Sequence, residues 1–301
     1  MINSLPPDTN QFLRQLERIN QRIAKANDQI SSGLRLKTAS DSPDQVSSLL
    51  RIRSEIGRNT QIQWNLGRVK AEVDAAETAI RTAVTILDEV KALGSQGASG
   101  SQPAESRKIL ADEVAAKLQN LVSLSQTAVE GRFVFSGDSD SVPPYTLDFQ
   151  QTPPISPYAG SPATRQIELP NGTLLSISKT AQELFDSSGP SESVFGTVND
   201  LREALLSGDE NAIREAIQAL DTAARYLNSK LGFYGIVQEQ LGQAINDSHS
   251  LDLRLRIEAA NIEEADLAAA ILELEMATIQ QEAALNAQAQ RPRRSLFDYL
   301  R

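Results

Sequence analysis

The stretch "LGRVKAEVDAAETAIRTAVTILDEV" at residues 66–90 carries the most regular pattern in this 301-residue chain. Its apolar residues recur at alternating spacings of three and four, which places them along one side of a helix. This seam consists of Leu66, Val69, Val73, Ala76, Ile80, Ala83, Leu87 and Val90. The pattern predicts a long helix, from about Asp44 to Leu93, that packs lengthwise against other helices.

Two further seams flank the first one. A third helix is predicted from about Ala104 to Val129, and Asp209 can cap a later helix that continues towards Leu255. The apolar positions of these two seams are Ala111, Val114, Leu118, Leu121, Ser125 and Ala128, and then Ile213, Ile217, Leu220, Ala224, Leu227 and Leu231. The stretch "GSQGASGSQPAES" at 94–106 is interpreted as a flexible connection within an antiparallel helical hairpin.

Both ends of the chain are also predicted to be helical. The first helix has a seam from Phe12 to Ile30 and ends near Gly33. The last begins near Glu263 and carries two stripes, one of Leu267, Ile271 and Leu274 and one of Leu272, Met276, Ile279 and Ala283. The polar link "ISSGLRLKTASDSPDQ" at 30–45 is expected to let the terminal helix swing, and an ordinary loop in a monomeric bundle is the alternative.

The terminal helices cannot be stable alone. Burying a large apolar side chain contributes about 1.5–3 kcal/mol, whereas ordering the backbone costs about 1–2 kcal/mol per residue. Burial of six seam residues does not offset the cost of ordering a helix of about twenty residues. Isolated helices of this length are also only marginally stable in water. The two ends must find each other, find copies of themselves, or stay disordered. We expect them to pair antiparallel, and only in the assembled state.

The middle of the chain has a different character. Six prolines between Val142 and Pro170 exclude a helix there, and Asn171-Gly172 favours a hairpin turn. The predicted fold class is therefore mainly α, with long antiparallel heptad helices from both termini forming a coiled-coil or bundle rod. The expected regions are a terminal coiled-coil layer of 1–42 with 256–301, a main helical bundle of 43–130 with 191–255, and a small β-rich surface insertion at 131–190.

Composition argues against several functions. The formal net charge of −10 disfavours nucleic acid and anionic membranes as partners, and no stretch is apolar enough for membrane insertion. There is no cysteine and His249 is the only histidine, so no cofactor, metal or catalytic site is expected. Asp138 and Asp140 lack the glutamate that closes a calcium loop. The first residues do not read as a cleaved signal peptide.

Four stretches resemble one known family. "ISSGLRLKTASDSPDQVS" at 30–47 and "RIEAANIEEADLAAAILELE" at 256–275 resemble the two ends of bacterial flagellins and their hook-associated relatives. "EGRFVFSGDSDSVPPY" at 130–145 and "SLFDYLR" at 295–301 look more like the third hook-associated branch of that family. This resemblance implies an extracellular structural subunit of the flagellum, not an enzyme. It also implies export without a cleaved signal peptide and assembly at the junction between hook and filament.

The resemblance also implies partners. These are copies of the chain, a neighbouring hook-associated protein, flagellin, the type III flagellar export apparatus and an export chaperone. The residues expected at the assembly interface are Phe12, Leu16, Ile19, Ile23, Ile30, Leu267, Ile271, Leu274, Met276, Ile279, Leu296, Phe297 and Leu300. Two alternatives stay open, namely a flagellin subunit of the filament itself and a stand-alone coiled-coil binding module.

Overall fold

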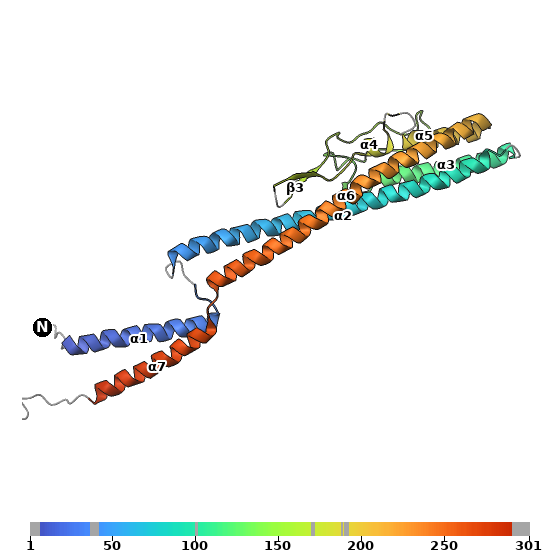
Figure 1. The fold of residues 1–301 in the computed structure, drawn as a ribbon. Helices are drawn as coiled ribbons and strands as arrows, with labels where there is room; N and C mark the ends of the chain where they lie inside the picture. Colours follow the sequence, from blue (N-terminus) through green and yellow to red (C-terminus); the bar gives the residue numbers. More distant parts are fainter. Residues whose placement is uncertain are drawn as a thin grey trace, which may run out of the picture. The chain divides into compact units, whose positions relative to one another are not determined.

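The computed structural model describes residues 7–36, 42–99, 102–169, 172–187, 189 and 193–290. The chain is mainly helical, as predicted, and its small strands lie in the middle of the sequence (Figure 1). It divides into two compact units. We call residues 1–58 with 252–301 the terminal unit and residues 59–251 the central unit.

The helices follow the predicted seams closely. They are α1 (Pro7–Ser32), α2 (Pro43–Gly97), α3 (Ala104–Ser125), α4 (Ala181–Phe185), α5 (Val194–Ser207), α6 (Glu210–Glu263) and α7 (Leu267–Ala289). The strands are β1 (Ala128–Val129), β2 (Arg132–Phe133), β3 (Gln166–Glu168) and β4 (Leu174–Ser176). The long helices α2 and α6 contribute residues to both units.

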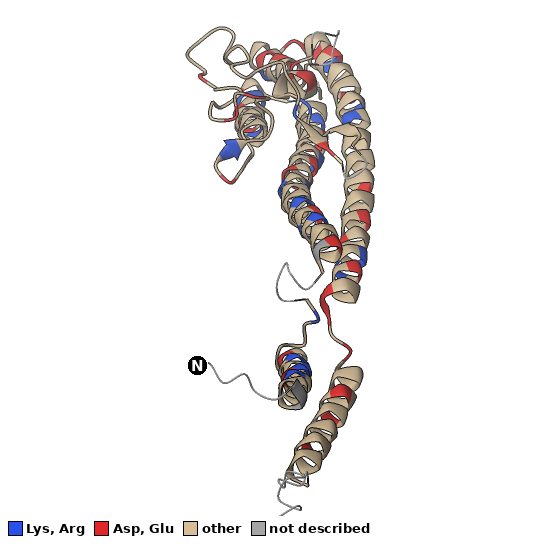
Figure 2. Cartoon of the chain, turned by 90° about the vertical axis from the view of Figure 1, so that its left-hand side faces the viewer, with Lys and Arg blue, Asp and Glu red and all other residues tan. Residues whose placement is uncertain are grey.

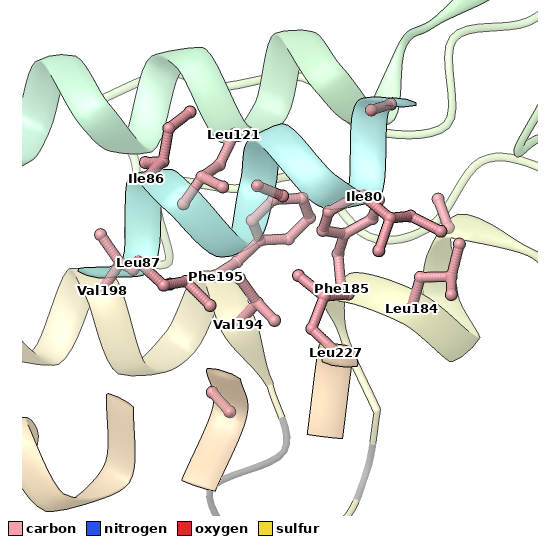
Figure 3. Packing of buried hydrophobic residues seen from close by; sticks show 14 of the residues in the cluster. Ile80, Ile86, Leu87, Leu121, Leu184, Phe185, Val194, Phe195, Val198 and Leu227 are labelled. Carbon is pink, nitrogen blue, oxygen red and sulfur yellow. The ribbon is translucent and has the colours of Figure 1, made fainter. Parts of the chain in front are cut away.

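The core of the central unit is built from the predicted seams. Every position of the α2 seam is buried except Val69, which is half-buried. This part of α2 runs antiparallel to α6: Gln238 Nε2 donates to Asp74 Oδ1 at 2.9 Å, and Lys91 Nζ lies 2.5 Å from Asp221 Oδ1. The helix α3 packs against α5. Figure 3 shows side chains from several of these helices meeting in one cluster.

Local chemistry explains where α6 begins and where α3 ends. Asp209 caps α6 as predicted, because its Oδ1 accepts the backbone N–H of Asn211 at 2.9 Å. The helix α3 stops four residues before the predicted end, at Ser125. The chain then turns back between β1 and β2 through Glu130 and Gly131, with φ of 52° and 77°. Positive φ at both turn residues is typical of the tight turn that joins two antiparallel strands.

The interpretation of 94–106 as a flexible connection is wrong for its first part. Gly94 and Gly97 are buried residues inside α2. A Cβ atom at Gly97 would lie 2.1 Å from Leu205 Cδ2, and one at Gly94 would lie 3.0 Å from Ile217 Cγ1. These glycines therefore let α5 and α6 approach the α2 backbone closely.

The β-rich segment forms part of the core and is not confined to the surface. The predicted hairpin is present, with β3 and β4 antiparallel and Gly172 at a φ of 80°. However, Phe135, Tyr145 and Phe185 are fully buried in the same cluster as the helices. The Phe185 ring stacks on Phe195 of α5 with centroids 5.4 Å apart (Figure 3). The boundaries 42, 130, 190 and 256 stay a prediction.

Candidate assembly interface

The helices α1 and α7 of the terminal unit pack against each other, and they come together where α1 ends and α7 begins and separate towards their other ends (Figure 1). The side chains buried between them are small: Ala26 is 1% exposed, Ala270 4% and Ala277 0%. Because a methyl group projects little, alanine lets two helix backbones approach closely. The pairing exists within one chain, so the expectation that it needs an assembled state is not supported.

Polar contacts fix the direction of the α1–α7 pair. Arg22 Nε donates to Glu273 Oε1 at 2.6 Å, and Arg22 Nη1 donates to Gln280 Oε1 at 2.8 Å. Gln281 Nε2 donates to Asn20 Oδ1 at 2.7 Å. The α1 residue with the lower number contacts the α7 residue with the higher number, so the pair is antiparallel as predicted. The hydrogen bond from Arg22 lowers the pKa of Glu273, but both side chains are open to solvent, where such pairs are weak.

Two backbone segments next to this pair are hydrogen-bonded to each other. Gly33, with a φ of 70°, ends α1 as predicted. Arg35 N donates to Glu263 O at 2.7 Å, and Ala265 N donates to Gly33 O at 2.9 Å. The residues 33–35 are thus tied to 263–265 before α7 begins. These hydrogen bonds hold the end of α1 in place, so the prediction that this end of the link lets α1 swing freely is wrong. Residues 37–41 of the link lie outside the described residues.

The predicted interface residues fall into three groups. Those on α1 and Leu274 on α7 are half-buried; they are Phe12, Leu16, Ile19, Ile23, Ile30 and Leu274. The remaining α7 residues are exposed, at 47% for Leu267, 48% for Ile271, 42% for Met276 and 65% for Ile279. Leu296, Phe297 and Leu300 lie outside the described residues. Sequence analysis missed Ala270 and Ala277 in α7, whose seven-residue spacing was the available signal.

The exposed side of α7 therefore carries large apolar side chains on two stripes, and Glu275 and Glu282 are exposed on the same helix. We call Leu267, Ile271, Leu272, Met276, Ile279 and Leu285 the α7 apolar face, and each of these side chains is at least 42% exposed. The helix carries three glutamates and no basic residue, whereas α1 carries Arg14, Arg18, Arg22 and Lys25 (Figure 2). Six exposed large apolar side chains on one helix are typical of a surface that another protein covers.

Other kinds of site are not supported in the described part of the chain. Within it, no three His, Cys, Asp or Glu side chains gather as a metal site would require. Its helices also include none that is long and apolar enough to cross a membrane. The described geometry fits a class of helical structural proteins that assemble through paired terminal helices.

Comparison with known proteins identifies the family. The profile described as "Bacterial flagellin N-terminal helical region" matches residues 3–140, and the "Bacterial flagellin C-terminal helical region" matches residues 217–300. The chain belongs to the bacterial flagellin family. It is an axial structural protein of the extracellular flagellum, and it is not an enzyme.

The relatives by sequence are flagellins. The chain is 22% identical over 297 residues to flagellin FlaB2 of Treponema pallidum, covering 96% of each chain. It is 27% identical over 119 residues to flagellin B of Helicobacter pylori, a match that spans 39% of this chain and 23% of that flagellin. The match to flagellin B is therefore partial, whereas the match to FlaB2 is nearly complete.

Solved structures share the fold. A putative flagellar hook-associated protein from Vibrio parahaemolyticus has a TM-score of 0.66 at 18% identity, covering 74% of this chain and 100% of that one. FlgL of Xanthomonas campestris has a TM-score of 0.59 at 16% identity, with 70% and 99% covered. The flagellar junction protein FlgL of Legionella pneumophila has a TM-score of 0.56 at 15% identity, with 71% and 100% covered.

Proposed function

We propose that this chain is a structural subunit that assembles at the junction between the flagellar hook and filament. The observation that carries the proposal is the α7 apolar face, which remains exposed after α7 has paired with α1. Large apolar side chains in such a row contribute to stability only when another surface covers them. Copies of the chain, a neighbouring hook-associated protein and flagellin are the partners in this proposal.

Two features favour the junction over the filament. The stretches at 130–145 and 295–301 resemble the third hook-associated branch of the family. The named FlgL structures share this chain's fold over nearly their whole length, which is compatible with the same role. In this proposal the subunit travels through the type III export apparatus with the help of an export chaperone.

A filament flagellin is the second candidate. It is favoured by the match to flagellin FlaB2, which covers 96% of both chains. A subunit of this kind would present the same α7 apolar face to many equivalent copies. A stand-alone coiled-coil module, the third alternative, would use that face to bind a single partner helix. These candidates differ in where the protein is found on the cell.

Immunogold labelling of intact cells of the source bacterium, with antibodies raised against the purified chain, tests the proposal. We expect a single labelled band at the outer end of each hook. Label along the whole filament would favour the flagellin alternative, and flagella without label would contradict both. Cells that lack the gene serve as the control, and they should keep their hooks but lose attached filaments.

A further inference from the structure

A pocket of about 370 Å³ opens on the central unit, and its lining is rich in arginine. Arg68 comes from α2, Arg132 from β2, and Arg165 from the residue before β3. This is unusual in a chain with a formal net charge of −10. The pocket is separate from the α1–α7 pair, because all of its lining residues belong to the central unit.

One buried carboxylate satisfies part of this positive charge. Glu72 of α2 lies 2.8 Å from Arg165 Nη2 through its Oε2, and 3.5 Å from Arg132 Nη2 through its Oε1. Its side chain is 8% exposed, and burial raises the pKa of Glu72, although Arg165 and Arg68 oppose that shift. Glu72 therefore holds Arg165 closely and Arg132 only loosely, because 3.5 Å is at the limit of a hydrogen bond.

The other acidic neighbours are weak partners. Arg132 Nη1 lies 3.5 Å from Asp140 Oδ2, and Arg68 Nε lies 3.3 Å from Glu130 Oε2. Glu130 is 62% exposed, so solvent screens that pair strongly. Asp138 also lines the pocket. The lining itself therefore holds three guanidinium groups against two carboxylates, those of Glu72 and Asp138.

One donor in the pocket region is left without an acceptor. Arg165 Nε is buried and has no hydrogen-bond partner among the described residues. A guanidinium has five N–H groups in a fixed plane, and a buried N–H group that lacks an acceptor is costly. Planar forks of this kind match the oxygens of carboxylates and phosphates. Thr164 and Asn65 line the same pocket and can add neutral hydrogen bonds.

We propose that this pocket binds a small oxyanion, a phosphate or a carboxylate, whose oxygens accept hydrogen bonds from Arg132, Arg165 and Arg68. The arginines come from α2, from β2 and from the residue before β3, so the bound anion ties the β-rich segment to the main helices. The volume exceeds that of a bare phosphate, so a sugar acid or sugar phosphate also fits. This site is independent of the proposed assembly role.

Thermal unfolding of the purified full-length chain tests the proposal. Inorganic phosphate, sulfate and glucuronate are each compared with chloride at equal ionic strength and constant pH. A ligand at tenfold its dissociation constant should raise the midpoint by about 3 °C or more, because it binds only the folded state. Phosphate and sulfate also stabilise folded proteins without binding them, so the arm whose shift is lost when Arg68 is replaced by glutamine distinguishes a phosphate ligand from a sugar carboxylate. Equal midpoints in all four salts would overturn the proposal.

Variants identify the pocket as the site. Arg68→Gln removes a half-exposed guanidinium and should weaken oxyanion binding at least fivefold, whereas Asp138→Asn removes a repelling carboxylate and should strengthen it. Arg214→Gln is the control, because Arg214 is an exposed arginine of α6 outside the pocket, with its side chain 59% exposed against 47% for Arg68, and this variant should bind like the wild type. Circular dichroism checks that each variant is folded. If Arg68→Gln and Arg214→Gln weaken binding equally, the anion is bound by overall charge and the proposed site is wrong.

Discussion

The two units of this chain bury very different side chains. The central unit encloses large residues, and Tyr145, Tyr234, Phe135, Phe185 and Phe195 are all less than 2% exposed. The α1–α7 pair of the terminal unit fully buries only alanines, and its large apolar side chains are half-buried or exposed. The comparison supports our proposal that the terminal pair serves assembly, whereas the core of the central unit supplies stability. Four predictions test that division, from the largest expected effect on stability to the smallest.

Deletion of residues 131–190, closed by a short glycine–serine linker, should abolish cooperative unfolding of the central unit. The deletion removes Phe135, Tyr145 and Phe185 from a core that they fill completely. A segment confined to the surface, as the sequence predicted, would tolerate this deletion. Thermal unfolding followed by circular dichroism measures the effect. A sharp transition at the wild-type midpoint would show that the helices need no aromatic contribution from this segment.

Phe185→Ala should lower the free energy of unfolding by about 3–5 kcal/mol, because it leaves a cavity between α4 and α5. Chemical denaturation measures the loss. Phe149→Ala is the matched control, since Phe149 is 38% exposed, and it should cost much less. If both variants lowered the free energy of unfolding equally, Phe185 would not be a core residue.

Glycine replacements within α2 should have opposite signs. Gly97→Ala should destabilise by about 1–3 kcal/mol, since the new methyl group would meet Leu205. Gly67→Ala should stabilise by up to about 1 kcal/mol, because nothing lies within 4 Å of its Cβ position and alanine favours a helix. Denaturation of both variants in parallel measures the difference. A gain of stability at Gly97 would mean that α5 does not approach α2 closely.

Ile279→Asp should change the stability of the free subunit by no more than about 0.5 kcal/mol, because the side chain is 65% exposed. It should nevertheless prevent assembly, since it places a charge in the α7 apolar face. Motility and electron microscopy of cells that express only the variant measure this. Gln15→Asp adds the same charge at an exposed position of α1, and this control variant should assemble normally. Normal filaments in cells with Ile279→Asp would show that the α7 apolar face is not part of the assembly interface.

The sequence predicted most of the helical architecture. The seam from Leu66 to Val90 and the cap at Asp209 are local patterns, so the sequence alone could predict them. The early end of α3 could not, because Ala128 and Val129 continue the helical spacing yet pair with β2 instead. Tertiary pairing outweighed local propensity there, as it often does for short segments.

The candidate interface was predicted in part. Periodicity placed Leu267, Ile271, Met276 and Ile279 on stripes of one helix, but it could not say which side of α7 faces α1. Hydrophobicity favoured the large residues, whereas the structure uses Ala270 and Ala277. The reason is distance, since only small side chains let the two helices lie close together. In our proposal, the large residues then contact a surface outside the chain.

The sequence by itself determined the mainly helical class, the antiparallel terminal helices and the family resemblance, because these depend on spacings along the chain. Only the tertiary structure decided that Gly97 is a packing residue, that Phe135 and Phe185 complete the helical core, and that three distant arginines line one pocket. Each of these depends on which segments meet in space. A periodic pattern specifies the side of a helix, but only the folded chain specifies what covers it.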